Sequence, residues 1–182
     1  ILGILTFLCG KTKRWLVHGK WGNMKVNIDA IDEKIIELMQ KNARISIKDI
    51  AAQVYLSSPA VTARIERLEK NKIILGYHAQ VNSEALGYKI KAFINLDLEP
   101  TQKNEFYPYI ENVENVIECN CVTGEYAMLM EVGFMDTEEL DKFINVLQRF
   151  GKTKTQIVFS TSVEHRSVPV RTWSEEYLEN RA

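Results

Sequence analysis

Residues 56–69 read LSSPAVTARIERLE, and this stretch decides how the first part of the chain folds. Ser58 followed by Pro59 predicts a helix start, because a serine side chain caps a helix and proline suits its first position. Apolar residues then recur at helical spacing and predict one buried stripe: Val61, Ile65 and Leu68. The opposite face combines small, polar and charged residues: Pro59, Thr62, Ala63, Glu66, Arg67 and Lys70. The sequence therefore predicts a helix with one free, polar face.

Two shorter helices are predicted upstream of this one. Asp29 suits an N-cap and Asp32 stands where a capping box has its acid, so a first helix runs to about Lys41. Ser46 caps a second helix, whose apolar stripe ends at Val54. Three helices with a tight turn between the second and the third form a helix-turn-helix. Residues 73–74 and 77–81 are predicted as short strands of a β-ribbon, which would make it a winged helix-turn-helix.

Spacing alone leaves two interpretations of these helices open. In the first, Ser57 and Ser58 bind a phosphate at the N-terminus of the third helix. Thr62 and Arg67 then face outward, where they reach base edges or phosphates of DNA. In the second, the three helices are a plain bundle whose arginines are solvated.

Strand and helix signals alternate differently after residue 87. We predict a strand, a helix, a hairpin, a second helix and a last strand: 89–99, 102–110, 116–122 with 125–134, 137–151, and 155–163. The order β-α-β-β-α-β is that of the ferredoxin-like fold, so the whole chain belongs to the α+β class. One face of such a sheet stays open, and we expect a partner subunit to cover it.

Net charge divides the chain close to this point, between residues 82 and 83. The 182 residues carry a formal charge of −1, which by itself disfavours nucleic acid. Residues 24–82 hold nine basic against seven acidic side chains, whereas residues 83–165 hold seven against fourteen. A mildly basic domain therefore precedes a strongly acidic one, and a tail follows at 166–182.

Residues 1–23 fit neither domain. Their apolar run, 1–9, is too short to span a bilayer, and basic residues follow it, whereas a secretory signal has them in front. The first methionine is Met24. We expect a mis-assigned upstream extension or a disordered leader; a membrane-surface anchor is the alternative.

No catalytic or metal-binding set can be assembled from the sequence. Cys9, Cys119 and Cys121 are too few for a disulfide framework, which favours a reducing cytoplasm. No histidine accompanies them at zinc spacing, and the three histidines are scattered. The sequence therefore predicts no enzyme, no metal and no cofactor.

Three stretches resemble the leucine-responsive/AsnC (Lrp/AsnC, feast/famine) family of prokaryotic transcription regulators. Residues 56–69 are similar to its recognition helix, and residues 74–77, with Asn82 and 86–88 behind them, to its ribbon and linker. Val122-Thr123-Gly124-Glu125-Tyr126 resembles the hairpin turn of its effector-sensing domain. The likeness covers residues from about 29 to 163. It implies a helix-turn-helix domain followed by a ferredoxin-like effector-binding and oligomerisation domain.

The resemblance implies a sequence-specific DNA-binding regulator that responds to an amino acid or a related small metabolite. Such a protein forms a homodimer, often assembles to a tetramer or octamer, and binds a near-palindromic site on double-stranded DNA, with no role for a membrane. The implied DNA-binding residues are Lys48, Ser57, Ser58, Pro59, Thr62, Ala63, Arg64 and Arg67. The implied effector-binding residues are Cys119, Cys121, Thr123, Gly124, Glu125 and Tyr126. Arg64 flanks the buried stripe, so it either binds a phosphate or braces the first helix.

The chain departs from the family pattern at four positions. Tyr55 and Lys72 stand where glycine is common, and a left-handed backbone costs other residues roughly 1 kcal/mol or more. We therefore expect shifted helix ends, with Asn71 as a substitute cap. Ala63 replaces a frequent basic residue, and Ala127 replaces an acid that would pair with an effector's ammonium. The rival interpretation is a metabolite-sensing ferredoxin-like oligomer with lost or weak DNA binding.

Overall fold

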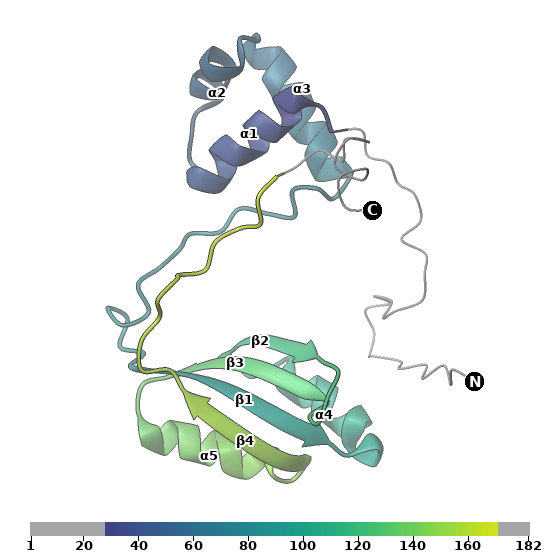
Figure 1. Cartoon of the computed structure of the whole chain (residues 1–182), viewed down its shortest axis with the longest axis vertical. Coiled ribbons are helices and arrows are strands. Elements are labelled where there is room, and N and C mark those ends of the chain that lie inside the picture. The colour runs from purple at the N-terminus through teal and green to yellow at the C-terminus, as the bar shows by residue number, and fades with distance from the viewer. Residues whose placement is uncertain (1–27, 171–182) are drawn as a thin grey trace, which may run out of the picture. The chain divides into compact units, whose positions relative to one another are not determined.

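The computed structural model describes residues 28–170, which divide into two compact units (Figure 1). Residues 28–80 and 164–170 belong to a helical unit, and residues 81–163 belong to an α/β unit. Each unit has its own apolar core. The expected leader at 1–23 and the part of the expected tail beyond residue 170 lie outside the described residues.

The helical unit contains α1 (Ala30–Lys41), α2 (Ile47–Val54) and α3 (Ser58–Lys70). Each helix begins after a residue whose side-chain oxygen accepts a backbone N–H that the helix itself leaves unpaired. Asp29 accepts from the N–H of Asp32, and Asp32 accepts in return from the N–H of Asp29, so the predicted capping box is confirmed. Ser46 caps α2 as predicted.

The start of α3 corrects one prediction. Ser57, and not Ser58, is the cap, because the Oγ of Ser57 accepts the N–H of Ala60 at 3.4 Å. Pro59 consequently occupies the second helical position. The N–H groups of the first turn have no acceptor within the helix, so proline, which lacks an N–H, fits at the second position as well as at the first.

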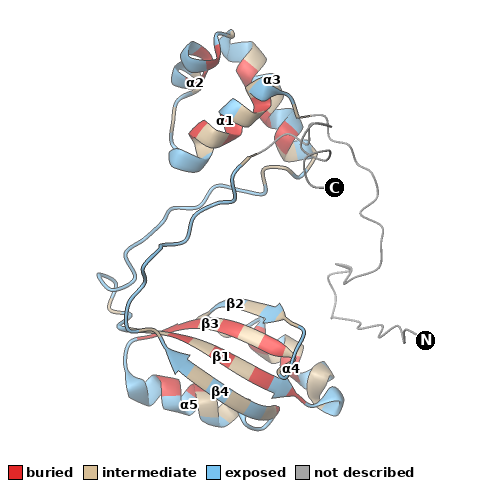
Figure 2. Cartoon of the chain, viewed as in Figure 1, coloured by how far each residue is buried: buried red, intermediate tan, exposed pale blue. Residues whose placement is uncertain are grey.

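One apolar cluster from all three helices forms the core of the helical unit (Figure 2). Its buried members are Ile35, Ile36, Leu38, Ile50, Ala51, Val54, Val61, Ile65 and Leu68. The predicted stripe of α3 is therefore buried as expected. Asp32 of α1 is also fully buried, although it carries a charge.

The β-ribbon predicted behind α3 is not formed, because residues 73–82 contain no strand. A strand needs a neighbour that satisfies its backbone groups, and within residues 28–170 the one sheet has all four of its strands in the α/β unit. The segment is attached to α3 instead: the backbone N–H of Ile73 donates to the carbonyl of Leu68 at 2.9 Å, and the hydroxyl of Tyr77 donates to Glu69 at 2.7 Å.

The α/β unit follows the βαββαβ order predicted from the sequence. Its elements are β1 (Ile90–Leu98), the 3-10 helix η1 (Pro100–Gln102), α4 (Lys103–Ile110), β2 (Val116–Cys121), β3 (Met128–Phe134), α5 (Thr137–Leu147) and β4 (Gly151–Ile157). The strands form one antiparallel sheet in the order β2-β3-β1-β4. Figure 1 shows α4 and α5 against one face of this sheet, which is the ferredoxin-like arrangement.

One face of the sheet is buried and the other is open, and Figure 2 shows the resulting alternation of buried and less buried residues along the central strands. Along β1, Ala92, Ile94 and Leu96 are fully buried, whereas Phe93 and Asn95 between them are half-buried. Opposed residues of an antiparallel pair point to the same side. The register therefore places the following residues of the other strands on the open face: Glu118, Asn120, Leu129, Glu131, Lys152, Lys154 and Gln156.

The last strand begins earlier than predicted, at Gly151 instead of residue 155, and ends at Ile157. Gly151 pairs with Leu98 at one end of β1, and Ile157 pairs with Ala92. A Cβ on Gly151 would lie 1.9 Å from the carbonyl oxygen of Asp97, so only glycine allows the chain to join β1 directly after α5. Pairing with the end of β1, and not the composition of residues 155–163, sets where β4 begins.

Candidate functional site

The free face of α3 presents most of the residues predicted to contact DNA. Five of them, at the start and along the first turns of the helix, are exposed: Ser57, Ser58, Pro59, Thr62 and Ala63. Lys48 is exposed in the first turn of α2. The hydroxyl of Thr62 donates to the backbone carbonyl of Ser58 at 3.1 Å, which holds that side chain against its own helix. The fold therefore leaves this helix face free for a ligand.

The N-terminus of α3 has the polar groups that suit an anion, although one serine is already in use. The hydroxyl of Ser57 accepts the N–H of Ala60 as the helix cap, so it stabilises the start of α3. Ser58, at the first helical position, is exposed. The partial positive charge of a helix N-terminus attracts phosphate oxygens to this position.

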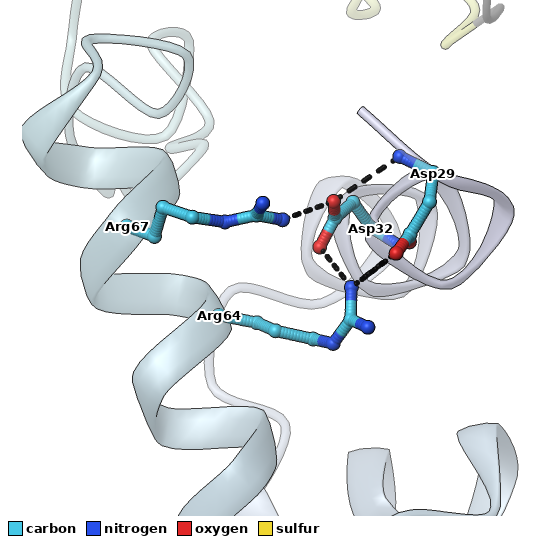
Figure 3. A network of polar contacts seen from close by, with 4 residues as sticks. All are labelled: Asp29, Asp32, Arg64 and Arg67. Carbon is cyan, nitrogen blue, oxygen red and sulfur yellow. Dashed lines mark hydrogen bonds and ion pairs between the residues drawn. The ribbon is translucent and has the colours of Figure 1, made fainter. Parts of the chain in front are cut away.

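Two arginines of α3 extend toward α1 and meet two aspartates there (Figure 3). Nη1 of Arg64 donates to both carboxylate oxygens of Asp29, at 2.9 and 2.7 Å, and to Oδ1 of Asp32 at 2.8 Å. Nη2 of Arg67 donates to Oδ2 of Asp32, which also accepts the backbone N–H of Asp29 at 3.2 Å. We call these four residues the Asp–Arg cluster.

The Asp–Arg cluster pairs a carboxylate that cannot reach water. Asp32 is 0% exposed, and a buried charge is costly unless it is paired and hydrogen-bonded. The backbone N–H of Asp32 and the guanidinium of Arg64 lower the pKa of Asp29. Hydrogen bonds to Asp29 and then to Asp32 raise the pKa of Arg64. Both shifts favour the charged forms, so the Arg64–Asp29 pair stays ionised at neutral pH.

The cluster shows one of the two roles that the sequence left open for Arg64. Its side chain is 25% exposed and bonded to both aspartates, so Arg64 braces α1. Arg67 differs from its predicted outward position, because its guanidinium turns to Asp32, yet its side chain remains 44% exposed. A guanidinium has five N–H donors, and the contact with Asp32 leaves others for a further acceptor.

Sequence reasoning missed the second role of the two aspartates. Asp29 and Asp32 were assigned only to the helix cap, which is a contact over three residues. Their contacts with Arg64 and Arg67 join residues 32 to 35 positions apart. Such pairs depend on how α1 and α3 pack, and a capping box in the sequence carries no signal for them.

Residues with a left-handed backbone flank α3 at both ends. Tyr55 ends α2 with a φ of 54°, and Lys72 follows α3 with a φ of 59°. The expected shift of the helix ends is therefore wrong, because the chain places non-glycine residues in the conformation that glycine favours. Asn71 is the C-cap of α3, but its φ of −82° is not left-handed, so it does not replace the glycine and Lys72 takes the left-handed conformation. Tyr55 exposes 94% of its surface beside the turn to α3.

The predicted effector residues divide between a hairpin turn and the sheet. Thr123, Gly124 and Glu125 are exposed together in the turn between β2 and β3, and Tyr126 beside them is half-buried. Gly124 has a φ of 124°, which explains the glycine at this position. The N–H of Val122 donates to the carbonyl of Ala127 at 2.9 Å and closes the turn. The structure thus brings the four turn residues to one place.

Cys119 and Cys121 lie in β2, on the side of the sheet that faces the core. They pair with Met130 and Met128 of β3, which are buried, and both cysteines pack against the apolar core. The neighbouring Glu118 and Asn120 point to the open face instead. Ala127, where the family often has an acid, also packs against the core.

Two segments outside the helices are attached to the helical unit. The hydrogen bond from Tyr77 to Glu69, together with partial burial, raises the pKa of Tyr77 to about 12, with burial the larger cause. Nε2 of Gln40 donates to the carbonyl of Val168 at 3.2 Å, and Val170 packs against the helical core. Part of the expected C-terminal tail therefore belongs to this unit.

Two kinds of site are absent from the part of the chain that the structure describes. Residues 28–170 contain no group of three or more histidine, cysteine, aspartate or glutamate side chains that could hold a metal ion. No helix in the same range is long and apolar enough to cross a membrane.

Comparison with protein families matches both units. The AsnC-type helix-turn-helix domain matches residues 28–69, and the Lrp/AsnC ligand binding domain matches residues 91–168. The HTH-type transcriptional regulator LrpA of Bacillus subtilis is 36% identical over 132 residues, which cover 72% of this chain and 97% of that protein.

Solved structures show the same fold. LrpC of B. subtilis superposes with a TM-score of 0.72 at 27% identity and covers 75% of this chain and 98% of its own. A feast or famine regulatory protein of M. tuberculosis, solved in complex with L-methionine, gives a TM-score of 0.73 at 26% identity and covers 79% and 99%.

Proposed function

The chain belongs to the Lrp/AsnC family of DNA-binding transcriptional regulators, and we propose that it binds near-palindromic double-stranded DNA as a homodimer and responds to an amino acid or a related metabolite. One observation carries the DNA-binding part. The polar face of α3, from Ser57 to Arg67, is exposed while its apolar face is buried in the core. A helix held in this way can enter the major groove.

The proposed DNA contacts differ in kind. Ser57, Ser58 and Lys48 lie where backbone phosphates would be met, and Thr62 lies on the free face of α3, where base edges would be met. Pro59 and Ala63 offer apolar contact on the same face. Arg67 contributes through the donors that Asp32 leaves unused, whereas Arg64 supports α3 from behind.

The open face of the sheet is proposed as the dimer interface. Phe93 of β1 and Leu129 of β3 are half-buried on it. Glu118 and Glu131 lie toward one edge, and Lys152 and Lys154 lie on the strand at the other edge. If two copies pack face to face around a two-fold axis parallel to the strands, the acidic edge of each meets the basic edge of the other. Higher assembly to a tetramer or octamer follows the family resemblance.

The turn between β2 and β3 is proposed as part of the effector site. Thr123, Gly124, Glu125 and Tyr126 supply hydroxyl, backbone and carboxylate groups, and Glu125 offers an acid for an ammonium where Ala127 has none. The relative from M. tuberculosis was solved with L-methionine, which makes amino acids the first candidates. Cys119 and Cys121 contribute as core residues beneath this turn.

The names of the relatives support a role without catalysis. They are named as transcriptional regulators. We therefore propose a non-enzymatic regulator that acts in the cytoplasm, where its DNA lies.

A gel shift tests the DNA-binding function. The full chain is titrated against duplexes from the promoter of its own gene and from flanking promoters, with a shuffled duplex of equal composition as the control. We expect binding to a promoter duplex that weakens steeply as salt rises, because phosphate contacts release counterions. Equal affinity for the shuffled duplex, or none for any duplex, would leave the rival function of a sensor with lost or weak DNA binding.

A thermal-shift screen of the amino acids tests the effector. A ligand at 100 times its Kd stabilises the folded state by about 2.7 kcal/mol, which raises the melting temperature. Glu125→Ala should abolish the response, while exposed Glu138→Ala in α5 serves as a control that changes the same charge elsewhere. A chain that responds to no amino acid contradicts this part of the proposal and leaves DNA binding untouched.

A further inference from the structure

We propose that Asp32 of α1 is a positioning residue for DNA recognition, which holds the guanidinium of Arg67 where that group binds a DNA phosphate. The inference rests on the DNA binding proposed above and deepens it. Asp32 is fully buried, so it cannot touch DNA itself. Its effect on DNA must therefore pass through the residues that it holds.

The carboxylate of Asp32 contacts α3 through two of its arginine side chains. Its Oδ1 accepts from Arg64 at 2.8 Å, and its Oδ2 accepts from Arg67, one helical turn further along α3. Figure 3 shows the two arginine side chains reaching from α3 to this one carboxylate. Arg64 is also tied to Asp29 and is little exposed, so it completes the brace. Arg67 is bonded once and is nearly half exposed, so it is the member that can also meet a ligand.

The chemistry of the guanidinium favours such a bridge. It is planar, always charged, and presents its donors on several sides, so one edge can bind the carboxylate while another binds a phosphate. A lysine ammonium is a point charge on a flexible stem and does not give this fixed two-sided geometry. Fixing the Arg67 rotamer before DNA arrives also reduces the side-chain entropy lost on binding.

Charge alone predicts the opposite effect for Asp32. A carboxylate close to the DNA-binding helix repels the phosphate backbone, so its removal should tighten binding if electrostatic repulsion were its only contribution. If Asp32 positions Arg67, its removal should weaken binding. The two explanations thus differ in the sign of one measured change.

Asp32→Asn is the test, because asparagine has nearly the same shape, can still accept the N–H of the capping box and loses the charge. Glu37→Gln is the matched control, since it removes one carboxylate from the same helix, and among the described residues that carboxylate forms an ion pair only with exposed Lys34, at 3.5 Å. Affinity is measured by fluorescence anisotropy with a labelled duplex from the protein's own promoter, at about 0.1 M salt. We expect Asp32→Asn to bind about tenfold more weakly and Glu37→Gln to bind as tightly as the wild type or more so.

A double-mutant cycle identifies the residue through which Asp32 acts. Arg67→Ala should weaken binding, and Asp32→Asn added to it should cause no further loss, because the DNA-contacting group that Asp32 holds is then absent while Arg64 keeps its bonds to Asp29. Arg67→Lys, at a partly exposed position, provides a second measurement if Asp32→Asn does not fold, as judged by its helical circular dichroism. We expect Arg67→Lys to lose about tenfold despite its conserved charge.

Three results would overturn the inference while the proposed function stands: unchanged or tighter binding by folded Asp32→Asn, a loss that persists in the Arg67→Ala background, or wild-type affinity for Arg67→Lys. If the wild type binds promoter DNA no better than the shuffled duplex, the proposed function and this inference fall together.

Discussion

The core of the helical unit and the core of the α/β unit are stabilised by different interactions. The α/β core contains fourteen buried apolar residues and no buried charge among the described residues, whereas the helical core contains nine and the carboxylate of Asp32. The α/β unit adds edge-to-face aromatic contacts: the ring of Phe106 lies 5.6 Å from that of Tyr107 and 5.5 Å from that of Phe150. The helical unit adds the Asp–Arg cluster.

This difference follows from how much of its surface each unit can bury. A helix that must leave one face free for DNA has fewer apolar contacts to set its orientation, so hydrogen-bonded ion pairs supply the missing constraint. A sheet covered by two helices can bury one whole face and needs no such pairs. The α/β unit should therefore respond most to changes of shape, and the helical unit to changes of charge.

The largest effect is expected from a change of shape at the start of β4. Gly151→Ala would place a Cβ 1.9 Å from the carbonyl of Asp97, and we expect a loss of at least about 3 kcal/mol from the α/β unit. Gly124→Ala is the control: its φ is also positive, but nothing lies within 4 Å of the added Cβ, so about 1 kcal/mol is expected. Amide hydrogen exchange in the sheet measures both, and equal losses would contradict the close approach at Gly151.

A change of charge should act on the helical unit. Arg64→Ala leaves the buried carboxylate of Asp32 with one arginine fewer, and we expect a loss of about 2 kcal/mol, measured by hydrogen exchange in α1 and α3. Lys34→Ala breaks an exposed pair and should cost less than about 0.5 kcal/mol. If the two variants lose the same stability, the Asp–Arg cluster is no more important than a surface ion pair.

Relief of backbone strain should stabilise the helical unit by a smaller amount. Tyr55→Gly and Lys72→Gly each place glycine at a φ between 54° and 59°. Relief of the strain should raise the free energy of unfolding by about 1 kcal/mol, and the greater entropy of glycine in the unfolded chain offsets part of this gain. Thermal unfolding of each variant beside the wild type checks this. A loss at Tyr55 would mean that its exposed ring makes a contact worth more than the strain.

The smallest effect is expected on the pH dependence of stability, when Asp29 is replaced and the pH is lowered. The pKa of Asp29 in the folded state lies below its ordinary value of 3.8, so the folded chain binds this proton more weakly than the unfolded chain. The contribution of Asp29 is fully present above that value and is lost as pH falls through the lowered pKa. Unfolding measured between about pH 5 and about pH 2, the range in which aspartates titrate, should show a shallower decline of stability in Asp29→Asn. An identical decline in both proteins would exclude Asp29 as a source of acid sensitivity.

Local signals predicted the elements of both units. Asp29 and Ser46 act within one turn of the helices they cap, and the alternation along residues 90–98 acts through neighbouring side chains. Two of the errors occurred where contact with a segment far along the chain decides the outcome. The ribbon at 73–81 has no ladder partner among the described residues, and β4 begins where Gly151 meets Asp97.

The sequence by itself determined the three helices of the helical unit, the order of elements in the α/β unit, the buried stripe of α3 and the turn that gathers Thr123 to Tyr126, because caps, periodicity and turn residues act over a few positions. Only the tertiary structure decided that Arg64 braces α1, that Arg67 is shared with Asp32, and that Cys119 faces the core. These outcomes depend on which surfaces come into contact when helices and strands pack. A contact between residues more than thirty positions apart has no signal in the local sequence pattern.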